Sequence, residues 1–161
     1  MSDNPAILTS SQLLELWLGH RQLTMRVLDA FPEKELFEFS IGGMRTAADM
    51  ASELLQMGAA MVKGVATGDW AELQAENPHR DKSALLAAWK DDLANIELTL
   101  PQVTAEQFRA EHTAFGFYTT SGLNQFLYSL ENEIHHRGQM YVYLRALGIE
   151  PPAFYERQMT S

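Results

Sequence analysis

The residues best suited to chemistry are concentrated in one short stretch, residues 131–139, whose sequence is ENEIHHRGQ. It places carboxylates, imidazoles, amides and a guanidinium between the two apolar halves of a long helical pattern, residues 121–148. Glu133 and His136 are three residues apart, so on a helix they lie one turn apart on the same side. Helical bundles build metal sites from a carboxylate and an imidazole at this spacing.

A complete metal site needs a further ligand from a facing helix. Glu53 is the best-placed donor elsewhere, because it lies at the edge of another apolar stripe. The predicted metal ligands are therefore Glu53, Glu133 and His136, which suit zinc, nickel, manganese or iron(II). Arg137 and Tyr141 could orient an anionic substrate. The structural alternative is an intrahelical Glu133–Arg137 ion pair, with His136 hydrogen-bonded at the rim of the bundle.

The composition limits the class of protein. A chain of 161 residues suits a single domain, and its net charge of −9 argues against a nucleic-acid surface. The absence of cysteine excludes a thiolate nucleophile, thiolate metal ligands and disulfides. We find neither a signal peptide nor an apolar run of about 18 residues, so no membrane contact is expected and the predicted location is cytoplasmic. No glycine-rich phosphate loop follows a strand, so no organic cofactor is expected.

Four amphipathic segments must position the polar stretch, and no strand pattern competes with them. The predicted helices cover about residues 10–31, 46–68, 81–100 and 121–148. Pro32, Gly68 and Pro151 mark helix ends. Between the third and fourth helices, we expect one helical turn at 104–108 and then an extended aromatic segment at 115–118. The fold class is therefore all-α: one four-helix-bundle domain over residues 1–161, with tails at 1–9 and 152–161.

Some residues outside the polar stretch carry smaller expectations. His20 lies on the apolar stripe of the first helix and is expected to be a core histidine with satisfied hydrogen bonds. Asp91 and Asp92 are expected on a solvated face of the third helix. Phe154 and Tyr155, in the C-terminal tail, are expected to pack back on the body of the bundle.

Two segments resemble the DinB-like family, the damage-inducible DinB and YfiT-type proteins. NEIHHRGQMYVYLRALGI, residues 132–149, resembles the last bundle helix of that family with its His-Arg-Gly-Gln element. GGMRTAADMASELL, residues 42–55, is similar to the entry into the family's second helix. The resemblance spans nearly the whole chain. It implies a four-helix bundle of up-down-down-up topology that is often dimeric, so a homodimer is expected.

The resemblance also implies an activity. Many members of the family hold a divalent metal with three histidines, and related members are transferases or isomerases that use small thiols. The three histidine positions fall at Glu53, Asn132 and His136 of this sequence, so only one is a histidine here. Either Asn132 or Glu133 completes the site, and the sequence leaves this open.

The sequence and its resemblance to the family support two alternative functions. The first is a metal-dependent thiol transferase or hydrolase with an altered site and a small thiol substrate. The alternative is a non-catalytic, stress-related bundle module that has lost the three-histidine site, with internal salt bridges in its place. Whether the chain is an enzyme stays open at this point.

Overall fold

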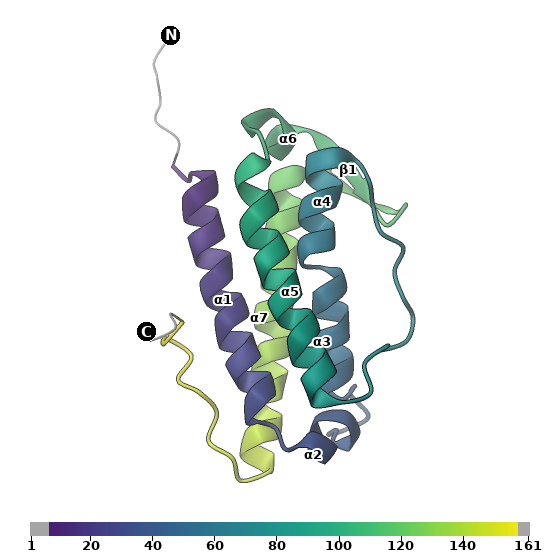
Figure 1. The fold of residues 1–161 in the computed structure, drawn as a ribbon, viewed down its shortest axis with the longest axis vertical. Helices are drawn as coiled ribbons and strands as arrows, with labels where there is room; N and C mark the ends of the chain where they lie inside the picture. The colour runs from purple at the N-terminus through teal and green to yellow at the C-terminus, as the bar shows by residue number, and fades with distance from the viewer. Residues whose placement is uncertain (1–6, 158–161) are drawn as a thin grey trace.

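The computed structural model describes residues 7–157 and consists of four long helical rods packed side by side, with short elements at both ends (Figure 1). The rods are α1 (Ser10–Ala30), the pair α3 (Ala47–Gln56) and α4 (Ala59–Thr67), α5 (Lys82–Thr99) and α7 (Gly122–Ala146). Helices α1 and α7 run in one direction, and the α3–α4 pair and α5 run in the other (Figure 1). This arrangement is the predicted up-down-down-up four-helix bundle. No helix among residues 7–157 is both long and apolar enough to cross a membrane.

Each rod begins at a residue whose side chain accepts a hydrogen bond from a free N–H of the first turn. These capping residues are Thr9, Thr46, Asp81 and Ser121. Gly68 and Gly148 follow the ends of α4 and α7 with φ values of 77° and 74°, a left-handed conformation that glycine adopts without strain. These caps are local in sequence, which is why the predicted boundaries agree closely with the structure.

The short elements close the two ends of the bundle. They are α2 (Glu33–Glu38), the 3-10 helix η1 (Leu100–Gln102), α6 (Ala105–Arg109), β1 (Glu111–Ala114) and β2 (Tyr118–Ser121). The two strands pair in antiparallel fashion, with Glu111 opposite Ser121, across a turn at Phe115 and Gly116 with φ values of 55° and 78°. Residues 115–117, which were expected to be extended, instead form the turn of this small hairpin at one bundle end (Figure 1), and only Tyr118 of that segment lies in a strand. The all-α class is otherwise confirmed.

The hydrophobic core runs the length of the bundle and takes large side chains from every rod. Fully buried examples are Trp17, Leu23, Leu28, Met50, Leu54, Met61, Trp89, Phe126 and Tyr143. Because every rod buries one face in this core, the opposite edges of α7 face α1 on one side and α3 on the other. This placement decides which polar residues of α7 meet which partner.

The second rod is interrupted at Met57 and Gly58, where the sequence predicted a continuous helix. Gly58 lies at the N-cap of α4 and has no side chain with which to cap it. The carboxylate of Asp92, on α5, instead accepts a hydrogen bond from the Ala59 N–H at 2.8 Å. A Cβ atom at Gly58 would overlap this carboxylate, so the close approach requires glycine.

The same carboxylate forms an ion pair with Arg21 of α1. The Asp92 side chain is only 9% exposed, so its predicted position on a solvated face is wrong, whereas Asp91 is exposed as expected. Arg21 also donates to the Leu54 carbonyl at 3.3 Å, and its guanidinium lies 3.8 Å from the ring centre of Trp89. Burial raises the pKa of Asp92, and the positive charge of Arg21 opposes that increase. One buried ion pair therefore connects α1 and α5 at the break in the second rod.

We expect Asp92→Ala to lower the free energy of unfolding by about 3–5 kcal/mol, because it leaves a buried guanidinium without its partner and uncaps α4. Urea denaturation measures the loss. Asp91→Ala is the matched control and should stay within about 0.5 kcal/mol of the parent protein. Asp92→Asn keeps an acceptor for the Ala59 N–H, so its loss of unfolding free energy should lie between the losses for Asp91→Ala and Asp92→Ala. Equal losses for Asp91→Ala and Asp92→Ala would contradict the assigned role.

Candidate functional site

Two of the three predicted metal ligands lie together between α3 and α7. The Nε2 atom of His136 is 3.4 Å from Oε1 of Glu53. Asn132, one turn earlier on α7, donates from Nδ2 to the same oxygen at 3.0 Å. The positions that the family resemblance assigned to three histidines therefore converge in space. We call Glu53, Asn132, His136 and the arginine described below the Glu53 site.

Glu133 is not part of this site, and its grouping with Glu53 and His136 is corrected. It is 1% exposed and points toward α1, where the hydroxyl of Thr24 donates to its Oε1 at 2.5 Å. Neighbouring residues on a helix differ by about 100° in direction, so Asn132 faces α3 while Glu133 faces α1. Among residues 7–157, no three His, Asp or Glu side chains form a group that could hold a metal ion. Metal binding itself stays a prediction.

The structural alternative for Glu133 is confirmed. Arg137 Nη1 lies 3.8 Å from Glu133 Oε1, one turn along the helix. Arg21 Nη1 approaches the other carboxylate oxygen at 3.5 Å, from α1. Glu133 is thus shared between two guanidinium groups in the bundle interior, and it extends the Arg21–Asp92 ion pair to α7.

Arg45 completes the Glu53 site, and the sequence analysis did not identify it. Its guanidinium forms an ion pair with Oε2 of Glu53 through Nη1, and its Nη2 lies 3.2 Å from Nε2 of His136. The Tyr143 hydroxyl donates to the Arg45 carbonyl at 2.9 Å and fixes the backbone at this point. Arg45 precedes the N-cap of α3 and belongs to no helical face, so periodicity carries no signal for it. Its only signal was its place in the segment 42–55 that resembles the family.

The hydrogen bonds of His136 define a competition at its Nε2 atom. Nδ1 lies 2.9 Å from Oε1 of Gln139, an atom that can only accept, so Nδ1 carries a proton. In the neutral ring Nε2 then accepts from Arg45. In the doubly protonated ring Nε2–H donates to Glu53 and faces the positive charge of Arg45. Arg45 and Glu53 therefore compete for the Nε2 atom of His136, Arg45 as a donor to it and Glu53 as an acceptor from it.

The carboxylate of Glu53 is held in its charged form. Its pKa is lowered from 4.5 to about 2 by hydrogen bonds, first from His136 when the Nε2 atom of that ring carries a proton and then from Asn132 and Arg45, whereas burial raises it. The site therefore holds one carboxylate, one imidazole and one amide, together with the half-exposed guanidinium of Arg45, which contacts both competent donors. These residues do not fit the three-histidine metal that the family resemblance implies, because Arg45 engages the lone pairs that a metal ion would need.

A cavity of about 660 Å³ lies beside the site, between α3 and the loop 69–81. Its lining residues are Arg45, Asp49, Ser52, Glu53, Met57, Leu73, Gln74, Ala75, Glu76, Asn77 and Arg80. Gln56 and Gln74 hold the loop over α3 through a reciprocal pair of hydrogen bonds, of 2.5 Å from the Gln74 N–H and 3.2 Å from the Gln56 amide. The cavity is therefore bounded by a loop that is tied to the helix.

Arg137 and Tyr141, the predicted substrate-binding residues, lie on the other side of α7. The Tyr141 hydroxyl donates to the Pro152 carbonyl at 2.7 Å, and Arg137 donates to the His20 carbonyl at 3.2 Å. They line a separate cavity together, so the structure removes them from the Glu53 site. His20 is buried, as expected for a histidine on the apolar stripe of α1, and its Nδ1 lies 2.8 Å from Nη2 of Arg137.

The pKa of Glu53 predicts how stability depends on pH. Its folded-state pKa of about 2 is below the value of 4.5 expected for the unfolded chain, so the charged form stabilises the fold above pH 4.5. That contribution is lost as the pH falls from 4.5 through about 2. We expect Glu53→Gln to lower the free energy of unfolding by about 1.5–3 kcal/mol at pH 7, with a difference that shrinks toward pH 2.

Urea denaturation of both proteins across this pH range measures the difference. Glu131→Gln is the control, because Glu131 is exposed on the solvent face of α7, one residue before Asn132. A difference between Glu53→Gln and the parent protein that did not change with pH would refute the assignment.

Known proteins share this arrangement of helices. A sequence model of the DinB family matches residues 1–161. YjoA of Bacillus subtilis (strain 168), a protein described as uncharacterized, is 24% identical over 155 residues, which are 93% of this chain and 98% of YjoA. The crystal structure of YjoA, a DinB-like protein, has a TM-score of 0.72 at 21% identity and covers 91% of this chain and 99% of its own. A DinB-like protein from Bacillus cereus ATCC 10987 has a TM-score of 0.72 at 18% identity, with coverages of 90% and 97%. Because the family match extends over its whole length, the chain belongs to the DinB family.

Proposed function

We propose that this chain is a binding module of the DinB family in which Arg45 takes the place of a metal ion. The observation that carries the proposal is the double contact of one guanidinium, with Oε2 of Glu53 and with Nε2 of His136. These are the two groups in the site with the ligand chemistry that a divalent ion requires.

A guanidinium supplied by the chain itself changes what the site can do. It neutralises the Glu53 carboxylate and so removes much of the electrostatic attraction that would draw a divalent cation. It is covalently tethered, so a metal ion would have to displace it and leave a cation unpaired beside the ion. Asn132 supports the same reading, because its amide already donates to Glu53 at 3.0 Å.

The adjoining cavity indicates the ligand class. Arg45 and Arg80 contribute positive charge, and Asp49, Glu53 and Glu76 contribute negative charge. Side chains of both signs around one cavity are suited to a small zwitterion, whose ammonium and carboxylate each find a partner. We therefore propose that the module binds a small zwitterionic molecule, such as a free amino acid, without metal-dependent chemistry.

A metal-dependent thiol transferase or hydrolase is the competing function. The 3.4 Å approach of His136 to Glu53 favours it, since a carboxylate and an imidazole at this separation could share one ion. The two functions differ in what Arg45 does: it substitutes for the metal in the first and would obstruct it in the second.

Metal binding by designed variants tests the proposal. We expect the untagged protein to bind less than about 0.1 equivalent of zinc or nickel at micromolar concentration, because Arg45 occupies the donors. The double variant Arg45→Ala/Asn132→His removes the guanidinium and provides one carboxylate and two imidazoles, so it should bind close to one equivalent. Equilibrium dialysis with metal analysis measures both, and Lys90→Ala/Glu97→His, with both changes at exposed positions of α5 and no histidine within one helical turn, is the matched control.

Stoichiometric metal in the parent protein, removed by Glu53→Ala, would overturn the proposal and support the metal-dependent function. A double variant that is folded but binds no metal would show that the three positions do not form a cation site at all.

Ligand binding is tested by thermal denaturation in the presence of each of the common free amino acids at millimolar concentration. At least one should raise the melting temperature of the parent protein, because a ligand that binds only the folded state stabilises it. The same amino acid should have no effect on Arg80→Ala. If none of them shifts the parent protein, the zwitterion assignment fails.

A further inference from the structure

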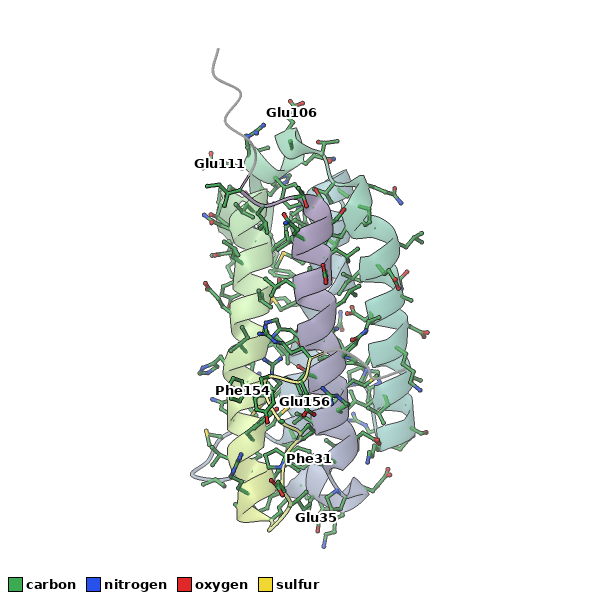
Figure 2. The ribbon with its side chains drawn as sticks, turned by 90° about the vertical axis from the view of Figure 1, so that its left-hand side faces the viewer. Phe31, Glu35, Glu106, Glu111, Phe154 and Glu156 are labelled. Carbon is green, nitrogen blue, oxygen red and sulfur yellow. The ribbon has the colours of Figure 1, made fainter. Side chains whose placement is uncertain are left out.

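A second cavity, of about 510 Å³, lies between α7 and the C-terminal segment 150–157, which we call the strap. The strap runs along the outside of α7 and α1, and Figure 2 labels Phe154 and Glu156 on it. We propose that this cavity binds an organic carboxylate with an apolar body. The cavity is separate from the Glu53 site, so the inference does not rest on the proposed function.

The walls of the cavity supply the apolar surface. Tyr141, Ile134 and the two prolines of the strap line it, together with Phe154 and Tyr155. Phe154 and Tyr155 are 70% and 69% exposed, so the predicted packing of these rings onto the body is not observed. The strap is attached by other contacts: Pro151 is buried, and Tyr141 donates to the Pro152 carbonyl at 2.7 Å. The exposed rings are left at the mouth, where an apolar ligand would cover them.

Positive charge gathers around this cavity in a protein of net charge −9. Arg137 and Arg145 line it, whereas Glu150 is its one acidic lining residue among those that the structure describes. Arg26 donates to the Glu156 carbonyl of the strap, and Arg157 reaches His20 beneath it. Two arginines and one carboxylate therefore line the cavity, and two further arginines lie on the strap or contact it, which favours an anionic ligand.

Behind the Arg137 side chain that lines the cavity, the cluster of Arg137, Arg157 and His20 has one more hydrogen-bond donor than acceptor. Arg137 Nη2 lies 2.8 Å from Nδ1 of His20, and Arg157 Nη1 lies 2.9 Å from Nε2 of the same ring. A neutral imidazole has only one acceptor nitrogen, so it can accept from only one of these guanidinium groups. Burial, then the charges of Arg137 and Arg157, lower the pKa of His20 to about 4, so the ring is neutral at pH 7.

One guanidinium N–H in this cluster therefore points at a ring N–H instead of an acceptor. Arg137 is the arginine of this pair that lines the cavity, so it is the one that an entering ligand reaches. A carboxylate there would accept the unmatched N–H, and His20 could keep its acceptor nitrogen for Arg157. Glu133 does not fill this role, because its nearest approach to Arg137 is 3.8 Å and it is engaged by Thr24. The positive charge, the apolar walls and the unmatched donor all favour an organic carboxylate with an apolar body as the ligand.

Isothermal titration with octanoate tests the proposal, with 1-octanol as the uncharged probe of similar length. Octanoate should bind at one site, and at least about tenfold more tightly than 1-octanol, because the carboxylate is required. Arg145→Glu, at an exposed position on the rim, should weaken octanoate binding at least about tenfold by charge repulsion. Lys90→Glu is the matched control with the same change of charge, because Lys90 is exposed on α5 and does not line this cavity, and this variant should bind octanoate like the parent protein.

Amide chemical shifts locate the binding. Octanoate should shift residues 150–157 and leave the loop 69–81 unchanged, which distinguishes this cavity from the one beside the Glu53 site. Arg45→Ala should bind octanoate like the parent protein. The proposal is overturned if octanoate fails to bind at millimolar concentration, if 1-octanol binds equally well, or if the shifts fall outside the strap and its cavity.

Discussion

The Arg21–Asp92 ion pair is the constraint on which the rest of the bundle depends. A break in the second rod leaves a free carbonyl at Leu54 and a free N–H at Ala59, and both are buried among the other helices. Arg21 satisfies the first and Asp92 the second, and each neutralises the charge of the other. Without either residue, the break would leave unsatisfied backbone groups and an uncompensated buried charge.

The break and its ion pair also fix the register of the helices around the Glu53 site. Glu53 lies one turn before the break, on the helix whose last carbonyls Arg21 helps to satisfy. Through Glu133, the same network reaches α7 one residue away from Asn132. The orientation of α7 that turns Glu133 toward α1 necessarily turns Asn132 and His136 toward α3. The buried network and the solvent-accessible site are therefore two consequences of one helix orientation.

The features that the sequence predicted are those that depend on near neighbours. Helix caps such as Thr46 and Asp81 satisfy N–H groups three residues away, so their residue types identify them. The break at Gly58 could not be predicted in this way, because its partner Asp92 is more than thirty residues distant in sequence. The helical periodicity correctly placed Glu133 within the apolar arc of α7. Periodicity within one helix does not determine which neighbouring helix each edge of that arc faces. Arg45 had no periodic signal, since it acts from a loop.

Charge pairing explains how the two sides of α7 came to differ. The buried carboxylates of Asp92 and Glu133 share Arg21, and the partly exposed carboxylate of Glu53 pairs with Arg45. On the α3 side this pairing neutralises the carboxylate of Glu53, so a cation is only weakly attracted there. A ligand that carries both charges is favoured instead. On the α1 side the interior carboxylates are already paired, so the additional arginines of α7 and of the strap exceed the acceptors that the bundle provides. An acidic protein thus acquires a local excess of positive charge where the strap crosses α7, and the bundle does not neutralise that excess by itself.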